Sequence, residues 1–460
     1  MLRPGRRGPA LARLAPRTYI RLMIPTLRLS DPDDRGRVEA LLRKLRLDPR
    51  DLVLGHQEEG ASVQAVLTDV AKRGDAALVD IARRFDDPGF TADQIRVRPE
   101  EMKAAASRVG TELTNALRRS VMQVRQYQQH IMPKPPETLR RDSGVELGLR
   151  FTPLETAGLY FPGGKSAYPS SLIMLAVPAQ VAGVGRIVVC SPGSKYGKSD
   201  LVLAACHELG LADVFRVGGA AAIAAMAFGT ETVPAVDKIV GPGNRYSQLA
   251  KRALAGCVGI DAFLGPSEIL VLADDSARAD FVAADLIAQA EHDPGSCFLL
   301  TTSPELAKEI TRQIERQART LKRRVALEKA LDAESAIILG ASMDELIPLA
   351  DRFAAEHVNI QTRDDHTVLG RLKHAGAVFL GPYSPVAAGD YVSGPSHCLP
   401  TNTTARFSSG ISVYEFLKRS SVVRYTSAGL AADAPSIVVL ADAEGLDGHA
   451  ASVRIRSPKS

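Results

Sequence analysis

The segments RIVVCSPG (186–193), DVFRVGG (213–219) and DKIVGPGN (237–244) decide the fold of this 460-residue chain. Each is a short β-branched run that ends in a turn rich in Gly or Pro. The second and third continue into helical patterns, AAIAAMAFG (221–229) and RYSQLAKRAL (245–254). Such alternation of strands and helices is typical of a parallel sheet with helices on both faces.

The same alternation extends in both directions from these segments. A second series of strand patterns begins with EILVLADD (268–275), so two runs, about 155–265 and 268–385, predict two α/β domains. Residues 31–130 carry apolar residues three and four apart, which predicts helices. The last 50 residues are short and mixed, with little core of their own, and are expected to dock on another surface.

Composition narrows the function classes. Trp is absent and aromatic residues make up 5%, which argues against a base-stacking nucleic-acid surface. The net charge of +5 is concentrated in residues 1–22, which hold six Arg and no acid, leaving about −1 for the rest. We therefore expect no polyanion partner. Residues 1–22 form a basic extension that we expect to be disordered, or that results from the choice of start codon, since Met23 could begin the protein.

The cysteines and apolar runs indicate a cytoplasmic protein. The five Cys are scattered without a CxxC pair, so we expect small buried thiols rather than a disulfide framework or a thiolate zinc site. No apolar run is long enough for a membrane span. Residues 1–22 lack the uninterrupted apolar segment of a secretory signal.

The stretch QAEHDP (289–294) offers half of a metal site. It closes a segment with apolar residues at 282, 286 and 290, which predicts a helix ending at His292. Gln289 and His292 would then share one face, with an amide oxygen and an imidazole aimed at one point. A surface or capping role is the commoner reading of such a pair, and Gln is an uncommon metal ligand.

Two other groups of residues could carry chemistry. Glu356 and His357 lie where a helix opened by the capping box Ser342-Met-Asp-Glu345 must give way to a strand. A carboxylate beside an imidazole can supply two proton-transfer groups, although a solvated bend is an equal alternative. The turn GPGN (241–244) ends a strand and opens a helix, where backbone N–H groups could meet a phosphate; a plain tight turn is as consistent with it.

Eight motifs in one order resemble the histidinol dehydrogenase family, over about residues 25–453. They are GLYFPGGKSAYPSS, VGGAAAIAAMAFGTETVPAVDKIVGPGN, GIDAFLGPSEILVLAD, AADLIAQAEHDP, AAEHVNI, GDYVSGPSHCLPT, ARFSSG and EGLDGH. The resemblance implies oxidation of L-histidinol to L-histidine, the last steps of histidine biosynthesis. This four-electron oxidation uses two NAD in succession, through a bound histidinaldehyde, with one Zn²⁺ per site.

The resemblance also implies roles for individual residues. Glu356 matches the group that activates water, and His357 matches the general base. The other matching residues are the zinc ligands Gln289, His292, Asp390 and His449; the substrate contacts Ser267, Gln289, His292, His357, Asp390, Glu444 and His449; and the NAD contacts Tyr160 and Asn244. The family is a homodimer in which the C-terminal tail, with Glu444 and His449, completes the partner's site.

The predicted fold is α/β, with two Rossmann-like parallel-sheet domains, a helical N-terminal segment and a small C-terminal tail domain. The segments are the extension 1–22, the helical segment 23–50, a discontinuous first domain (51–155 plus 268–411), a second domain (156–267) and a dimer-exchanged tail (412–460).

The chain departs from the family pattern at several positions. Ala221 stands where Gln is frequent, Ala355 where Pro is usual and Ser396 where Asn is frequent, while Asn402 and Thr403 stand where Gly is common. Three alternative functions stay open. They are a related zinc- and NAD-dependent dehydrogenase of another diol or amino alcohol, a zinc hydrolase, and a non-catalytic metal-binding scaffold.

Overall fold

The computed structural model describes most of the chain. The described residues are 24–46, 48, 50, 55, 57–163, 167–194, 197–262, 267–292, 295–321 and 323–456. The predicted basic extension 1–22 lies outside them. Among the described residues, no helix combines the length and the apolar character that crossing a membrane requires.

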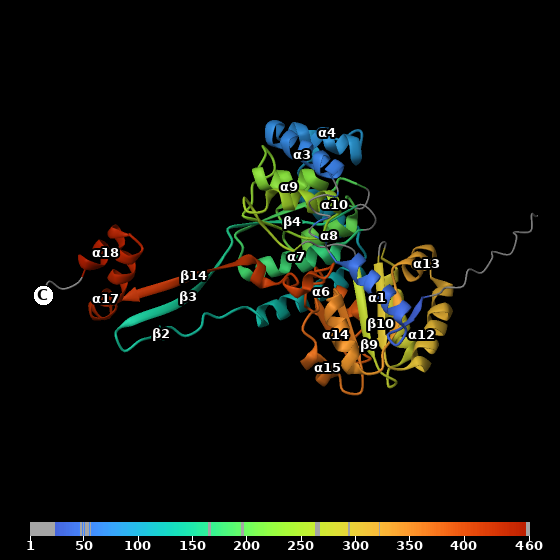
Figure 1. The fold of residues 1–460 in the computed structure, drawn as a ribbon. Coiled ribbons are helices and arrows are strands. Elements are labelled where there is room, and N and C mark those ends of the chain that lie inside the picture. The colour runs from blue at the N-terminus through green and yellow to red at the C-terminus, as the bar shows by residue number, and fades with distance from the viewer. Residues whose placement is uncertain are drawn as a thin grey trace, which may run out of the picture.

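A six-stranded parallel sheet, in the order β1-β11-β10-β9-β12-β13, forms one half of the molecule (Figure 1). Its strands are β1 (Thr26–Arg28), β9 (Ser267–Ala273), β10 (Gly295–Thr301), β11 (Ala336–Leu339), β12 (His357–Gln361) and β13 (Ala377–Leu380). Successive residues of a strand enter different cores: Ile269 and Val271 pack on one face and Leu270 and Leu272 on the other. Both faces are therefore buried, as a parallel sheet requires.

Helices cover both faces of this sheet. One face is covered by α11 (Ala279–Ala290), α12 (Pro304–Gln317) and α13 (Arg324–Ala333). The other is covered by α1 (Pro32–Leu45), α14 (Met343–Phe353) and α15 (Asp365–Arg371). The predicted helical segment 23–50 thus contains a strand, β1, that joins this sheet beside β11. A three-residue strand is too short to show alternation in the sequence.

A five-stranded parallel sheet, in the order β6-β5-β4-β7-β8, forms the second half. Its strands are β4 (Thr156–Tyr160), β5 (Arg186–Ser191), β6 (Asp213–Arg216), β7 (Lys238–Val240) and β8 (Gly259–Ile260). One face packs on α7 (Pro169–Ala182) and α8 (Asp200–Glu208), and the other on α9 (Gly219–Phe228) and α10 (Arg245–Leu254). The predicted α/β fold with two parallel sheets is confirmed.

The helices between residues 57 and 130 also cover the five-stranded sheet. They are α3 (Gln57–Arg73), α4 (Asp75–Phe85), α5 (Pro99–Arg108) and α6 (Thr111–His130). Here α3 packs on α9 and α10, while α6 packs on α7. This differs from the predicted grouping of 51–155 with 268–411, because an amphipathic pattern shows which face of a helix is buried but not which sheet buries it.

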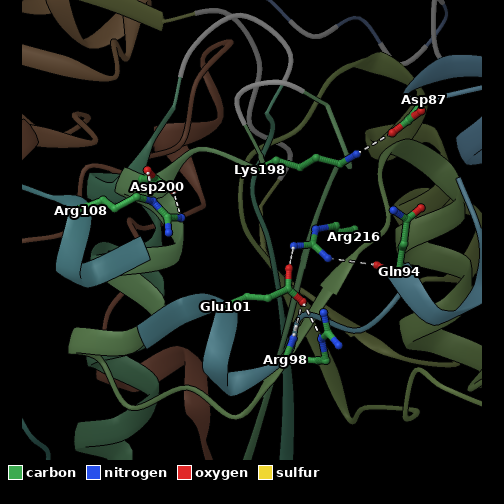
Figure 2. Close-up of polar contacts among 8 residues, drawn as sticks. All are labelled: Asp87, Gln94, Arg98, Glu101, Arg108, Lys198, Asp200 and Arg216. Atoms are coloured by element: carbon green, nitrogen blue, oxygen red, sulfur yellow. Dashed lines mark hydrogen bonds and ion pairs between the residues drawn. The ribbon is translucent and has the colours of Figure 1, made fainter. Parts of the chain in front are cut away.

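Ion pairs hold α5 on this half of the molecule (Figure 2). Arg108 of α5 lies 2.6 Å from Asp200 of α8, and Glu101 of α5 lies 2.7 Å from Arg216 of β6. The Arg108 pair is half exposed, so screening by solvent keeps its net contribution to stability small.

An antiparallel arm projects from the body and ends in two helices (Figure 1). The arm contains β2 (Leu139–Arg140), β3 (Val145–Pro153) and β14 (Leu417–Tyr425), with β14 paired along the whole length of β3. Helices α17 (Ser427–Ala443) and α18 (Asp447–Arg454) lie at its far end. Nearly all of β14 is exposed, and so are Val439 and Leu440 of α17, at 67% and 64%.

Two smaller expectations differ from the structure. All five cysteines are free, but only four are buried: Cys257, in the turn before β8, is exposed. Ser342 caps α14 without a side-chain hydrogen bond, and Glu345 Oε2 accepts the backbone N–H of Ala341 at 2.8 Å, so the reciprocal capping box is not formed. The helix still begins at the predicted position.

Candidate active site

A cleft of about 2630 Å³ separates the two parallel sheets. Its lining includes residues predicted to bind substrate, cofactor or metal: Tyr160, Asn244, Ser267, His292, Glu356, His357 and Asp390. The carboxyl ends of the five-stranded sheet face this cleft, since β4 ends at Tyr160 and Asn244 follows the end of β7. The six-stranded sheet instead presents its amino ends, where β9 begins at Ser267 and β12 at His357.

The five-stranded half of the cleft has the form of a cofactor site. Strands β5 and β6 extend from β4 in one direction and β7 and β8 in the other, so β4 and β7 flank the point where the strand order reverses. Ligands of open α/β sheets bind at the carboxyl ends of strands at such a point. Helices α9 and α10 both begin here, with Gly219 and Asn244 at their starts, and their N-terminal N–H groups suit an anion.

Tyr160 and Asn244 are both engaged within the fold. The Tyr160 hydroxyl accepts the backbone N–H of Gly219 at 3.1 Å, and burial raises the pKa of this phenol to about 12. Asn244 caps α10, with its Oδ1 accepting the N–H of Ser247 at 3.1 Å. Gly243 packs on the Tyr160 ring, because a Cβ there would lie 2.9 Å from Tyr160 Cε1. The two predicted cofactor residues therefore share one wall of the cleft.

Glu356 and His357 lie at the predicted junction between a helix and a strand. Helix α14 ends at Phe353, Ala354 turns the chain with a left-handed φ of 43°, and β12 begins at His357. Both side chains are buried, and Glu356 Oε2 lies 3.5 Å from His357 Nδ1. The solvated bend that the sequence left open is thereby excluded.

Strand β9 holds both side chains through one residue. The backbone N–H of Glu268 donates to Glu356 Oε2 at 3.0 Å, and the Glu268 carbonyl oxygen lies 3.2 Å from His357 Nδ1. A carbonyl only accepts, so Nδ1 carries the imidazole proton and Nε2 is left as the basic atom. Ser267 adds a third contact, with its hydroxyl donating to Glu356 Oε2 at 2.5 Å.

Burial moves the pKa values of both groups in the direction that favours their neutral forms. It raises the pKa of the Glu356 carboxyl to about 8, against the hydrogen bonds from Ser267 and Glu268 that favour the ionised form. Burial likewise lowers the pKa of His357 below its ordinary value, partly opposed by the charge of Asp390. His357 is therefore a neutral base near pH 7, and Glu356 becomes a base only near pH 8.

Two of the predicted ligands in the body of the chain, His292 and Asp390, line the cleft together with this pair. Gln289 is buried on α11, and among the described residues its Nε2 has no hydrogen-bond partner. His292 lies beyond the end of α11 at Ala290, so the prediction that Gln289 and His292 share one face of a helix is wrong. Its N–H still bonds the Gln289 carbonyl at 3.1 Å. Burial lowers the pKa of His292, and the charge of Asp390, on α16 (Val386–Tyr391), opposes this.

The C-terminal members of the predicted set are not in this cleft. Glu444 is the C-cap residue of α17, and His449 lies on α18. Both residues are exposed, and both helices lie at the far end of the arm (Figure 1). Accordingly, within the part of the chain that the structure describes, no group of three or more His, Cys, Asp or Glu side chains is placed to hold a metal ion.

The structure adds two residues that were not predicted. His397 lines the cleft, with Nδ1 bonded to the Asp390 carbonyl oxygen at 2.8 Å and Nε2 lying 3.1 Å from Ser171 Oγ. Glu268 is buried, and its Oε1 accepts the N–H of Asn402 at 2.8 Å. His397 follows Asp390 by seven residues in one motif, so the sequence contained a signal for its place in the site. Glu268 lies in a strand, and no sequence pattern marked it as a site residue.

Three of the five positions where the chain departs from the family pattern line the same cleft. Asn402 and Thr403 line it and have positive φ angles, 56° and 62°. This explains why Gly is common there, since Gly adopts such angles without steric cost. Ala221 lines the cleft in the first turn of α9, on the side of the predicted cofactor residues.

The buried Glu356 carboxyl predicts a pH-dependent stability. In the unfolded chain this carboxyl has its ordinary pKa of 4.5, whereas in the folded protein burial raises the pKa to about 8. Its contribution to stability is therefore full below about pH 4.5 and is lost as pH rises towards 8. Glu356→Gln mimics the protonated form. Between about pH 4.5 and pH 8, the free energy of unfolding of the variant should increase relative to that of the wild type, by on the order of a few kcal/mol in total. Above about pH 8 the difference should stay constant.

Urea unfolding of the two proteins at about pH 5, 7 and 9, with a chelator present, measures this difference. An equal difference between variant and wild type at all three pH values would contradict a buried carboxyl that is neutral at low pH.

Comparisons with known proteins agree with this geometry. The family model described as histidinol dehydrogenase matches residues 54–457. A histidinol dehydrogenase of Geobacillus kaustophilus is 45% identical over 412 residues, covering 89% of this chain and 96% of that protein. One of Bradyrhizobium diazoefficiens is 46% identical over 397 residues, covering 86% and 92%. The crystal structure of the Elizabethkingia anophelis histidinol dehydrogenase superposes with a TM-score of 0.87 at 32% identity, covering 94% and 98%. The chain therefore belongs to the histidinol dehydrogenase family of oxidoreductases.

Proposed function

We propose that this chain catalyses the NAD-linked, zinc-dependent oxidation of L-histidinol to L-histidine through a bound aldehyde, as a cytoplasmic enzyme of histidine biosynthesis. The observation that carries the proposal is the buried Glu356–His357 pair, which lies in one cleft with the cofactor-type edge of the five-stranded sheet. The relatives that match most of the chain are named for histidinol.

The types of side chain predicted as ligands suit one zinc ion per site, although one chain supplies only three of the four proposed ligands. Gln289, His292 and Asp390 would hold it, with His449 supplied by the tail of a second subunit. Burial keeps the His292 imidazole neutral, as a metal ligand must be, and the buried Gln289 amide is incompletely hydrogen-bonded. When bound, zinc would hold the imidazole and amine of the substrate and so fix the orientation of its alcohol.

The five-stranded edge fits a dinucleotide. Tyr160 and Asn244 would contact NAD, and the N-termini of α9 and α10 would face its phosphates. NAD supplies the hydride acceptor in each of the two oxidations. Ala221 offers no side-chain hydrogen bond at the position where the family often has Gln.

The two buried groups divide the proton transfers between them. His357 takes the hydroxyl proton at Nε2 in the first oxidation, since Nδ1 is held by the Glu268 carbonyl oxygen. Ionised Glu356 takes a proton from the water that adds to the aldehyde before the second oxidation. Ser267, beside Glu356, would contact the substrate. We therefore assign the two steps different dependence on pH.

A second copy of the chain is the proposed partner. The arm carries exposed apolar side chains along β14 and α17, including Val422, Val423, Val439 and Leu440. Several large apolar side chains exposed on one projecting element favour an interaction site there. Docked on a second subunit, the tail would bring Glu444 as a substrate contact and His449 as a zinc ligand to the partner's cleft.

Counting NADH per histidinol consumed tests the function. The expected value is about two, one per hydride transferred. Removal of zinc with a chelator should abolish turnover, and re-addition should restore it. A zinc hydrolase or a metal-binding scaffold would form no NADH, and a dehydrogenase of another amino alcohol would turn over histidinol far more slowly than its own substrate.

Glu356→Gln should separate the two steps. The amide cannot accept a proton, so oxidation of added histidinaldehyde should fall by about 10²–10⁴-fold, while the first oxidation keeps most of its rate. In the wild type, the rate of aldehyde oxidation should rise with pH towards about 8, as Glu356 ionises. Single-turnover NADH formation from each substrate measures both. Equal loss of the two steps would remove the water-activating role.

Mixing two inactive variants tests the shared site. His449→Ala and His357→Ala chains should each be inactive, because each lacks a residue of every site. After subunit exchange, one site of each mixed dimer is intact, so activity should return to about a quarter of wild type. No recovery, despite exchange shown by mass spectrometry of labelled chains, would contradict a tail that completes the partner's site.

A further inference from the structure

A buried ion pair lies at the carboxyl end of the five-stranded sheet. Lys251 of α10 and Asp261, which follows β8, are 2.6 Å apart, with side chains 1% and 0% exposed. Lys and Asp are almost never this buried unless they are paired. None of the proton transfers described above uses either residue.

Both partners also hold a single residue of the chain, Gly241. Asp261 Oδ2 accepts the backbone N–H of Gly241 at 2.6 Å, and Lys251 Nζ donates to its carbonyl oxygen. Gly241 follows β7, whose pairing with β4 ends at Val240. The N–H and C=O of Gly241 are therefore satisfied by these two side chains and not by the sheet.

Gly241 begins the turn that forms the cofactor wall of the cleft. Its φ of 120° favours glycine, and a Cβ there would lie only 1.9 Å from the carbonyl oxygen of Tyr160. The turn then continues through Pro242 and Gly243 to Asn244, all of which line the cleft. The orientation of Gly241 therefore fixes where these residues lie relative to Tyr160.

Stability alone does not account for the pair. Burying two charges costs desolvation that their attraction often only offsets, and apolar side chains of similar size are frequently as stabilising. Apolar side chains, however, could not bond the N–H and C=O of Gly241, which would then be buried without partners. The distinctive contribution of the pair is one defined orientation of the turn.

We propose that Lys251 and Asp261 are positioning residues for the cofactor-binding turn 241–244 and thereby set the affinity of the chain for NAD. The inference rests on the proposed NAD-linked function. It extends that function to a pair outside the sites of proton transfer and metal binding. The pair acts through the backbone of Gly241.

The variants are Lys251→Met, Asp261→Asn and the double substitution, which is uncharged and keeps an acceptor for the Gly241 N–H. Hydrogen exchange of the amides in 238–248, measured without NAD, should be faster in each single variant. Calorimetric titration of the zinc-loaded proteins should show about tenfold weaker NAD binding, with histidinol binding changed less than about twofold. Asp200→Asn, which removes the exposed pair with Arg108 (Figure 2), is the matched control and should change neither quantity.

Unchanged exchange and unchanged NAD affinity in folded variants would overturn the inference. So would parallel weakening of NAD and histidinol binding, which indicates general loosening of the fold. If Lys251→Met does not fold, hydrogen exchange and NAD binding of Asp261→Asn and of the double variant test the inference. A wild-type chain that does not bind NAD would overturn the proposed function instead, while hydrogen exchange would still show whether the pair orders the turn.

Discussion

The backbone of Glu268 is the point on which the active site depends. Its N–H bonds Glu356 and its carbonyl oxygen bonds His357, so one strand residue fixes the carboxyl group and the tautomer of the imidazole. At the amino end of β9, these backbone groups can serve side chains because the ladder with β12 starts further along, at Ile269 opposite His357. A buried backbone group must find a partner, and here the partners are the two groups proposed to move protons.

The arrangement of the two sheets follows a similar logic. The carboxyl edge of the five-stranded sheet carries turns and helix N-termini that suit an anionic cofactor. The amino edge of the six-stranded sheet carries buried polar side chains instead. Because the two edges meet across one cleft, a cofactor bound at the first would lie beside the acid–base groups at the second. The enclosure that brings them together also raises the pKa of Glu356 and lowers that of His357.

Local patterns in the sequence were sufficient for most strands of the two parallel sheets, most helices and the Glu356–His357 junction, but not for β1 or for the strands of the arm. They were insufficient where the outcome depends on distant partners. The helices between 57 and 130 were recognised, but their association with the five-stranded sheet depends on surfaces that periodicity does not specify. His292 was predicted to lie on a helix, but that helix ends at Ala290. The sequence has Pro at position 294, and Pro lacks the backbone N–H that a further helical turn would need. Glu268 was missed because a strand residue acting through its backbone leaves no side-chain signature.

The arm poses the same problem on a larger scale. Glu444 and His449 were predicted as site residues, yet in one chain they lie at the end of an exposed antiparallel ribbon, apart from the cleft; the ribbon is two strands wide except where the two-residue β2 joins β3. An isolated ribbon is marginally stable in water, and this one carries exposed Val422 and Val423. Docking on a second subunit would bury these side chains and complete the ligand set that one cleft lacks. The same contact would then stabilise the tail and assemble the metal site, so metal affinity and dimerisation should be thermodynamically linked.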